Sequence, residues 1–171
     1  TDKSAARTRL TREQVLENCQ KYQEQAATIL NFSGANPVEL KYNNDWLGKM
    51  NFADVLELSS HFTVQQILER DMFEKRVKEE KPIFLHEFLY PLMQGYDSVA
   101  IAKKYGSCDV ELGGNDQYFN LLAGRTLMEA HGLPKQDIMT FDLLVGSDGK
   151  KMSKTSPNTV AIDEPLHDMH Q

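Results

Sequence analysis

The sequence is poor in the features that mark several special classes of protein. Its 171 residues contain two cysteines, Cys19 and Cys108, and no CxxC pair. This disfavours a disulfide framework or a cysteine-based metal site, and it predicts two reduced thiols. No apolar run approaches the ~20 residues of a membrane span, and the first ten residues lack the apolar core of a secretion signal. We expect a cytoplasmic protein, or a soluble organellar one, with no membrane partner.

An excess of positive charge is also missing. Lys and Arg total 19 and Asp and Glu total 25, so the formal net charge is −6. This balance argues against a general nucleic-acid coat or a polybasic membrane binder, although a local basic patch is compatible with it. The hydrophobic share of 40% and the charged share of 26% are those of one ordinary folded domain, or of a substantial piece of a larger one.

Capping signals and apolar periodicity predict helices with short strands between them. The predicted helices cover residues 11–30, 52–62, 63–80, 84–105 and 116–131, and the predicted strands cover 38–42, 108–112 and 140–145, the last one buried. A turn is expected at 146–149. Pro91 is placed either in the first turn of its helix or at a kink. Connections long enough for crossovers indicate an α/β fold with a parallel sheet.

The first of three polar segments is the lysine-rich loop Lys150–Thr155. Lysines in a loop bounded by glycine and serine can clamp a polyphosphate whose charge grows in a transition state. Lysine pairs are also common in hydrophilic surface loops, and charge alone favours that simpler interpretation.

The second segment is Gly113-Gly114-Asn115-Asp116-Gln117, between a predicted strand and a predicted helix. Its glycines allow close approach of a ligand, and Asp116 can accept hydrogen bonds from ribose hydroxyls. The alternative is that Asn115 or Asp116 simply caps the helix. The position at the carboxyl end of a strand favours a ligand, because open α/β sheets bind their ligands there.

The third segment carries Tyr90, Gln94 and Asp97. Spacings of four and three residues put these side chains on one face of a helix. That face is otherwise apolar, so the three polar groups need partners. A small polar ligand and an internal hydrogen-bond network explain them equally well.

The three segments together resemble the catalytic domain of class I aminoacyl-tRNA synthetases of the bacterial tyrosyl type. The segment Lys151-Met152-Ser153-Lys154-Thr155 resembles the K-M-S-K-S signature, and Leu112–Gln117 resembles the G-G-x-D-Q segment. Tyr90–Asp97 resembles the tyrosine-binding helix of that family. Asn43–Leu47 and Asp2-Lys3-Ser4 also match. The resemblance covers nearly the whole chain and implies a Rossmann-like parallel sheet with flanking helices.

For the amino acid, the resemblance implies that Asp97 accepts a hydrogen bond from the phenol of tyrosine. Tyr90, Gln94 and Asp2 would hold the α-ammonium group, and Gln117 would contact the substrate near its carboxyl end. Two further residues are expected to have a supporting role: Asn43 and Trp46.

For the nucleotide, the resemblance implies that Asp116 binds the ATP ribose, with Gly114 allowing close approach. Lys151, Lys154 and Thr155 would stabilise the departing pyrophosphate. ATP would enter as its magnesium complex, with no tightly bound cofactor and no metal site made by the protein. The partners implied are L-tyrosine, ATP, tRNA(Tyr) and a second copy of the chain.

The sequence also departs from the family pattern. The H-I-G-H signature and an anticodon-binding domain are absent, so we expect the latter part of a catalytic domain that is inactive when isolated. Residues 46–88 correspond to the helical connective insertion of the family. A homodimer surface is expected there, with Phe52, Phe62 and Phe73 as candidate members.

Two alternatives stay open at this point. Tryptophanyl-tRNA synthetases share the lysine clamp and a G-x-D-Q segment, but their equivalent helix has two alanines where this chain has Gly95-Tyr96. The chain can also be a non-catalytic module that binds nucleotides or forms dimers.

Overall fold

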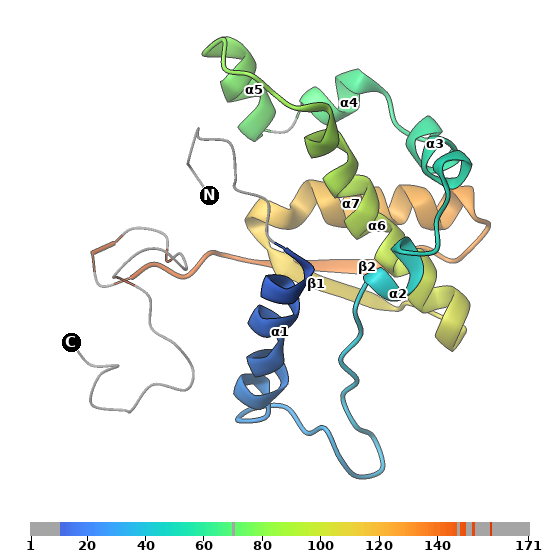
Figure 1. The fold of residues 1–171 in the computed structure, drawn as a ribbon, viewed down its shortest axis with the longest axis vertical. Coiled ribbons are helices and arrows are strands. Elements are labelled where there is room, and N and C mark those ends of the chain that lie inside the picture. Colours follow the sequence, from blue (N-terminus) through green and yellow to red (C-terminus); the bar gives the residue numbers. More distant parts are fainter. Residues whose placement is uncertain (1–10, 70, 147, 150–151, 153–157, 159–171) are drawn as a thin grey trace. The chain divides into compact units, whose positions relative to one another are not determined.

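A computed structural model describes residues 11–69, 71–146, 148–149, 152 and 158. The chain forms two compact units, residues 1–42 with 144–171, and residues 43–143. The second unit contains the described residues of the predicted amino-acid site and most of the described helices (Figure 1). Among the described residues, no helix is long and apolar enough to cross a membrane.

The first unit is built on helix α1, Arg12–Ala26. Thr11 and Gln14 form the predicted capping box at its start. The predicted strand at 38–42 is wrong: this segment is irregular, and no described strand pairs with it. A run of weakly alternating residues does not form a strand without a neighbouring backbone to complete its hydrogen bonds. The turn at 146–149 is confirmed, since the Gly149 N–H donates to the Gly146 carbonyl at 2.9 Å.

Four short helices open the second unit: α2 (Asn44–Leu47), α3 (Phe52–Ser60), α4 (Val64–Leu68) and α5 (Asp71–Lys78). The single helix predicted over 63–80 is therefore wrong. Ile67 and Phe73 are both buried, yet six residues on a straight helix separate two side chains by roughly 120° around the axis. A break between α4 and α5 lets both side chains enter one core.

Helix α6, Leu85–Tyr105, is continuous, and Pro91 lies inside it rather than in its first turn. Its N-terminus is fastened by Glu87, which accepts from the Phe84 N–H at 2.9 Å. The same carboxylate makes a two-point ion pair with Arg76 of α5, at 2.6 and 3.0 Å. This pair lowers the pKa of Glu87, and it ties α5 to the start of α6. Gly106 ends α6 in the left-handed conformation at φ 93°.

Strands β1 (Val110–Gly114) and β2 (Asp137–Phe141) pair in parallel, with Val110 opposite Asp137 and Gly114 opposite Phe141. Between them lie the short 3-10 turn η1 (Asn115–Gln117) and helix α7 (Tyr118–Ala130). The buried strand predicted at 140–145 is displaced: β2 ends at Phe141, and residues 143–145 are exposed. The reason is that β1 turns into η1 after Gly114 and offers no further backbone partner. The α/β class with a parallel sheet is confirmed.

Helix α7 packs against α6 on one side and contacts both strands on the other (Figure 1). The two helices come close at Gly95, where a Cβ atom would lie 2.9 Å from the backbone of Ala123 and Gly124. The core holds side chains from α3 to α7, with these hydrophobic members: Leu58, Ile67, Phe73, Leu92, Val99, Ala102, Leu127 and Met128. Phe73 is 0% exposed, which contradicts its predicted place on a dimer surface.

Candidate amino-acid-binding site

Asp97 is a half-buried acid on α6. Its Oδ1 accepts a hydrogen bond from Nε1 of Trp46 at 2.8 Å, and Asn43 is a second hydrogen-bond partner. Burial raises the pKa of Asp97 to about 6, helped by the nearby charge of Glu111 and opposed by these two hydrogen bonds. The two residues predicted to support the site therefore hold the carboxylate that is predicted to meet the phenol.

Gln94 lies three residues before Asp97 and belongs to a second polar group. Its Oε1 accepts from Nδ2 of Asn120 at 2.9 Å, and the same nitrogen donates to Oε1 of Gln117 at 2.9 Å. Asn120 is 1% exposed and lies in the first turn of α7. The structure thus joins two predicted site residues, from α6 and η1, through one buried amide.

Tyr90 is the third polar residue of the predicted helix face, and it is largely exposed. Of the two explanations offered by the sequence, the internal network accounts for contacts of Gln94 and Asp97. Both side chains are only half-buried, so they still face outward in part. A network that fixes partly exposed polar groups is also what a binding site for a polar ligand needs.

The double-glycine corner closes β1 next to η1. A Cβ at Gly114 would lie 2.8 Å from Leu143 and 2.9 Å from Oδ1 of Asp116, so the chain is tightly folded there. Nδ2 of Asn115 donates to Asp142 at 2.6 Å, which joins η1 to the chain just after β2. Helix α7 has Gln117 as its N-cap without a side-chain cap bond, so capping of α7 does not explain Asn115 or Asp116.

Sequence reasoning missed two buried amides. Asn120 sits in the helix that follows the G-G-x-D-Q segment, and its spacing of three from Gln117 was the available signal. Gln136 is 0% exposed, and its Nε2 donates to Glu111 at 2.8 Å and to Ser98 at 3.2 Å. No short motif marks Gln136, because its partners come from distant parts of the chain.

Four of the predicted site residues lie outside the described part of the structure: Asp2, Lys151, Lys154 and Thr155. The structure therefore bears on the amino-acid side of the site and on the double-glycine corner. Among the described residues, no cluster of three or more acidic, histidine or cysteine side chains is placed to hold a metal ion.

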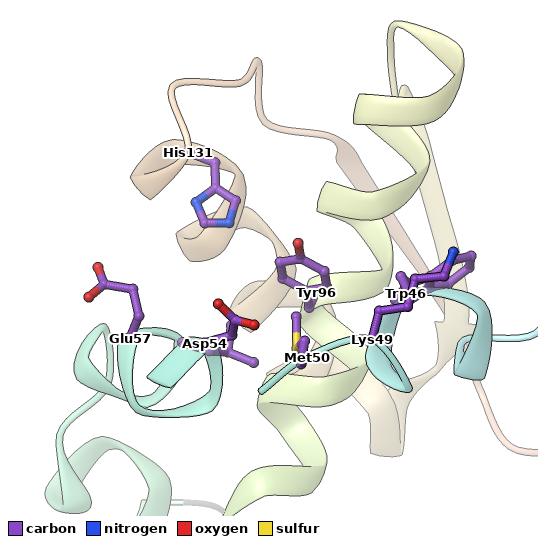
Figure 2. Close-up of a pocket in the computed structure, with 8 residues that line it drawn as sticks. Trp46, Lys49, Met50, Asp54, Glu57, Tyr96 and His131 are labelled. Atoms are coloured by element: carbon purple, nitrogen blue, oxygen red, sulfur yellow. The ribbon is translucent and has the colours of Figure 1, made fainter. Parts of the chain in front are cut away.

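A separate cavity of about 380 Å³ lies beside the candidate site, between α2, α3, α6 and the end of α7 (Figure 2). Trp46 is the one lining residue that also takes part in the candidate site, because its indole donates to Asp97. The remaining lining residues are Lys49, Met50, Asp54, Glu57, Leu58, Tyr96 and His131. Burial lowers the pKa of His131, and the charges of Lys103 and His61 lower it further.

The parallel α/β arrangement, with a glycine corner at the end of β1 and polar helix faces beside it, is that of a Rossmann-like α/β domain. Residues 1–170 match the family described as tRNA synthetases class I (W and Y), and the chain belongs to this family.

Curated relatives agree with this placement. The chain is 50% identical over 169 residues to a tyrosine–tRNA ligase of Thermotoga maritima and 49% identical over 169 residues to that of Chlorobaculum tepidum. In each case 98% of this chain is aligned and 40% of the relative is covered. The chain therefore spans about two-fifths of the length of the curated relatives it matches.

Solved structures share the fold. A truncated mitochondrial tyrosyl-tRNA synthetase of Aspergillus nidulans superposes with a TM-score of 0.63 over 90% of this chain and 50% of that one, at 22% identity. The corresponding protein of Coccidioides posadasii gives a TM-score of 0.57 over 77% of this chain and 43% of that one, at 23% identity.

Proposed function

We propose that these residues belong to a tyrosine–tRNA ligase that activates tyrosine with ATP and transfers it to tRNA. In the first step a carboxylate oxygen of tyrosine attacks the α-phosphorus of ATP, and the bond to the β-phosphate oxygen breaks. Pyrophosphate leaves, and tyrosyl-adenylate forms. In the second step a terminal ribose hydroxyl of tRNA attacks the activated carbonyl, and AMP leaves.

The observation that carries this proposal is the environment of Asp97. A half-buried carboxylate held by Trp46 and Asn43 is a directed acceptor for a phenolic hydroxyl. A ligand without that hydroxyl would leave the carboxylate short of a partner, which penalises phenylalanine. The curated relatives are tyrosine–tRNA ligases, so their names carry the same amino acid.

For the nucleotide we propose that Asp116 binds the ribose of ATP. Gly114, which has no side chain, lets ATP come close to the protein backbone. Lys151, Lys154 and Thr155 would stabilise pyrophosphate as negative charge moves onto it, with magnesium bound to ATP as part of the substrate. Contacts that strengthen as charge develops lower the barrier more than contacts made equally to substrate. We place the protein in the cytoplasm, in keeping with its two predicted free thiols.

Pyrophosphate exchange tests the catalytic assignment. In the complete gene product that contains these residues, Lys151→Ala and Lys154→Ala should each slow tyrosine-dependent exchange by roughly a hundredfold or more. Lys81→Ala, at an exposed residue distant in sequence from the loop, is the control and should leave the rate unchanged. An unchanged rate in both loop variants would show a non-catalytic module.

Calorimetry tests the substrate. The complete gene product should bind tyrosine in preference to phenylalanine, which has no side-chain donor for Asp97. We also expect weaker binding of tryptophan, whose indole N–H would have to reach the same carboxylate from a larger ring. Preference for tryptophan would move the chain to the tryptophanyl branch of its family.

We also propose that residues 46–88 form the connective insertion and carry a homodimer surface. Phe52 and Leu85 are 77% and 79% exposed, which is unusual for such large apolar side chains unless a partner covers them. Phe62 packs against the core from a half-buried position, so replacing it would disturb folding as well as association.

Sedimentation velocity of the variants Phe52→Asp and Leu85→Asp tests this proposal, because it measures the balance between monomer and dimer. Each variant should shift the complete gene product toward monomer, because a carboxylate in an apolar interface loses its hydration. Val38→Asp, at an exposed apolar residue outside the insertion, is the matched control. A dimer of undiminished stability in both test variants would remove the surface from consideration.

A further inference from the structure

Asn120 is a buried side chain whose contacts go to the two glutamines of the candidate site. Both hydrogens of its Nδ2 are engaged, one with Gln94 and one with Gln117, at 2.9 Å each. Its own Oδ1 is buried and has no hydrogen-bond partner among the described residues. A buried carbonyl without a partner costs free energy, so an amide here needs a reason that packing alone does not supply.

The reason we identify is orientation. An amide side chain has two ends of opposite hydrogen-bonding character, and nothing but its partners decides which end faces a ligand. Because Asn120 donates to both glutamine oxygens, the NH₂ group of Gln117 points away from Asn120 and can donate to another group. The Gln94 oxygen keeps its second lone pair for another donor.

The close approach of α6 and α7 makes this arrangement possible. Gly95 follows Gln94, and it lies against the backbone of Ala123 and Gly124, one turn beyond Asn120. A side chain at position 95 would push the helices apart, and Asn120 would no longer reach Gln94. The glycine and the buried amide thus belong to one local design.

We propose that Asn120 is a positioning residue that presents Gln117 as a donor to the carboxylate of the substrate amino acid and leaves Gln94 able to accept from its ammonium group. This inference rests on the proposed function, and it adds to it the residue that sets the polarity of the site. Asn120 itself does not need to touch the substrate.

The test compares tyrosine with tyramine, which has the same phenol and ammonium group but no carboxylate. Dissociation constants are measured by calorimetry at pH 8 on the complete gene product. In Asn120→Asp the carboxylate can only accept, so both glutamines turn their NH₂ groups toward it. Gln117 then presents an oxygen to the substrate carboxylate, and the nitrogen of Gln94 replaces the oxygen that accepted from the ammonium group.

We expect Asn120→Asp to weaken tyrosine about tenfold or more, the effect of losing a hydrogen bond to a charged group, and to weaken tyramine clearly less, because tyramine loses only the contact with Gln94. Asn120→Leu keeps the same branched arrangement of side-chain heavy atoms and adds no charge. It frees both glutamines, so Gln94 can still turn its oxygen to the ammonium group, and it should weaken tyrosine by about three- to tenfold with little effect on tyramine. Asn31→Asp is the charge-matched control, because a carboxylate there still accepts from Ser33.

Circular dichroism identifies any variant that does not fold, and the Leu variant carries the test if the buried Asp is not tolerated. Equal weakening of tyrosine and tyramine in a folded variant would overturn the inference, and so would unchanged tyrosine binding. If the parent protein binds tyrosine normally, each of these two results contradicts only the role of Asn120 and does not contradict the proposed function. A parent protein that binds no tyrosine overturns both.

Discussion

The contact between α6 and α7 contains two buried amides with similar chemistry and different surroundings. Asn120 contacts Gln94 and Gln117, which are half-buried and partly open to solvent. Gln136 contacts Ser98, which is buried, and Glu111. Each amide has one buried oxygen without a hydrogen-bond partner among the described residues.

The difference lies in where each network ends. The Asn120 network ends on side chains that can turn toward a ligand, so its orientation has consequences outside the protein. The Gln136 network closes on itself: Ser98 donates to Glu111 at 2.8 Å, and Gln136 donates to the same carboxylate oxygen. We infer that the first network serves binding and the second serves folding, and the following variants test that division.

The largest effect is expected from Gly95→Ala, which disturbs the helix contact shared by both networks. The new methyl group meets backbone atoms at 2.9 Å, and backbone moves at high cost. Urea denaturation should show a loss of about 2 to 3 kcal/mol, despite the higher helix propensity of alanine.

Gly132→Ala is the control for this variant. Its φ is 67° and nothing lies within 4 Å of the new methyl group, so it should cost only about 1 kcal/mol. Equal losses in the two variants would mean that backbone strain, rather than crowding between helices, governs both.

Gln136→Leu separates the two networks. It removes one of the donors to the half-buried Glu111 carboxylate, and it should lower the free energy of unfolding by about 2 kcal/mol. Tyrosine affinity should stay within about twofold of the parent, in contrast to the Asn120 variants. A large loss of affinity with little change in stability would reverse the roles assigned to the two networks. Gln65→Leu, at an exposed residue of α4, is the control.

Asp97→Asn should stabilise the fold while it weakens tyrosine binding. The folded pKa of about 6 exceeds the ordinary value of 3.8, so the folded state binds more protons between these pH values. The contribution of Asp97 to stability therefore falls as pH rises from about 4 to 6 and stays low above that. The variant should gain about 1 to 2 kcal/mol at pH 8 and nothing below pH 4, a range that allows for partial exposure of the carboxyl.

Two measurements check this prediction. Thermal unfolding at pH 8 and at pH 3.5 gives the stability difference, and calorimetry gives the affinity. Tyrosine binding by the parent protein should strengthen as pH rises through about 6, where the acceptor becomes ionised. Binding that is independent of pH across this range would mean that Asp97 does not meet the phenol.

Glu87→Gln should have the smallest effect, because the ion pair with Arg76 lies outside both networks. The loss should be about 1 kcal/mol at neutral pH by thermal denaturation. Because the folded pKa of Glu87 is lowered, its contribution is complete above the ordinary value of 4.5 and disappears as pH falls below that. Glu74→Gln breaks the exposed pair with Lys78 and should have no measurable effect. Similar losses from both variants would show that burial adds nothing to the Arg76 pair.

Local signals in the sequence predicted much of this fold. The capping boxes at Thr11 and Thr63 begin helices as expected, and the strand predicted over 108–112 lies two residues later, at Val110–Gly114, with the double glycine inside it. The family motifs also selected Asp97, which the structure places with Trp46 and Asn43, and Gln94 and Gln117, which it joins through Asn120. The predictions for residues 1–10 and 150–157 stay predictions, since nearly all of those residues lie outside the described part of the structure.

What the sequence determined by itself was local: where helices begin, which side chains share a helix face, and which motifs accompany one another. Only the tertiary structure decided where β2 ends, why α4 and α5 are separate helices, and that Phe73 is buried. It also decided that Asn120 connects two glutamines from different elements. The physical reason is that strand pairing, core filling and buried hydrogen bonds depend on partners far apart in the chain, and short-range patterns do not specify which partners meet.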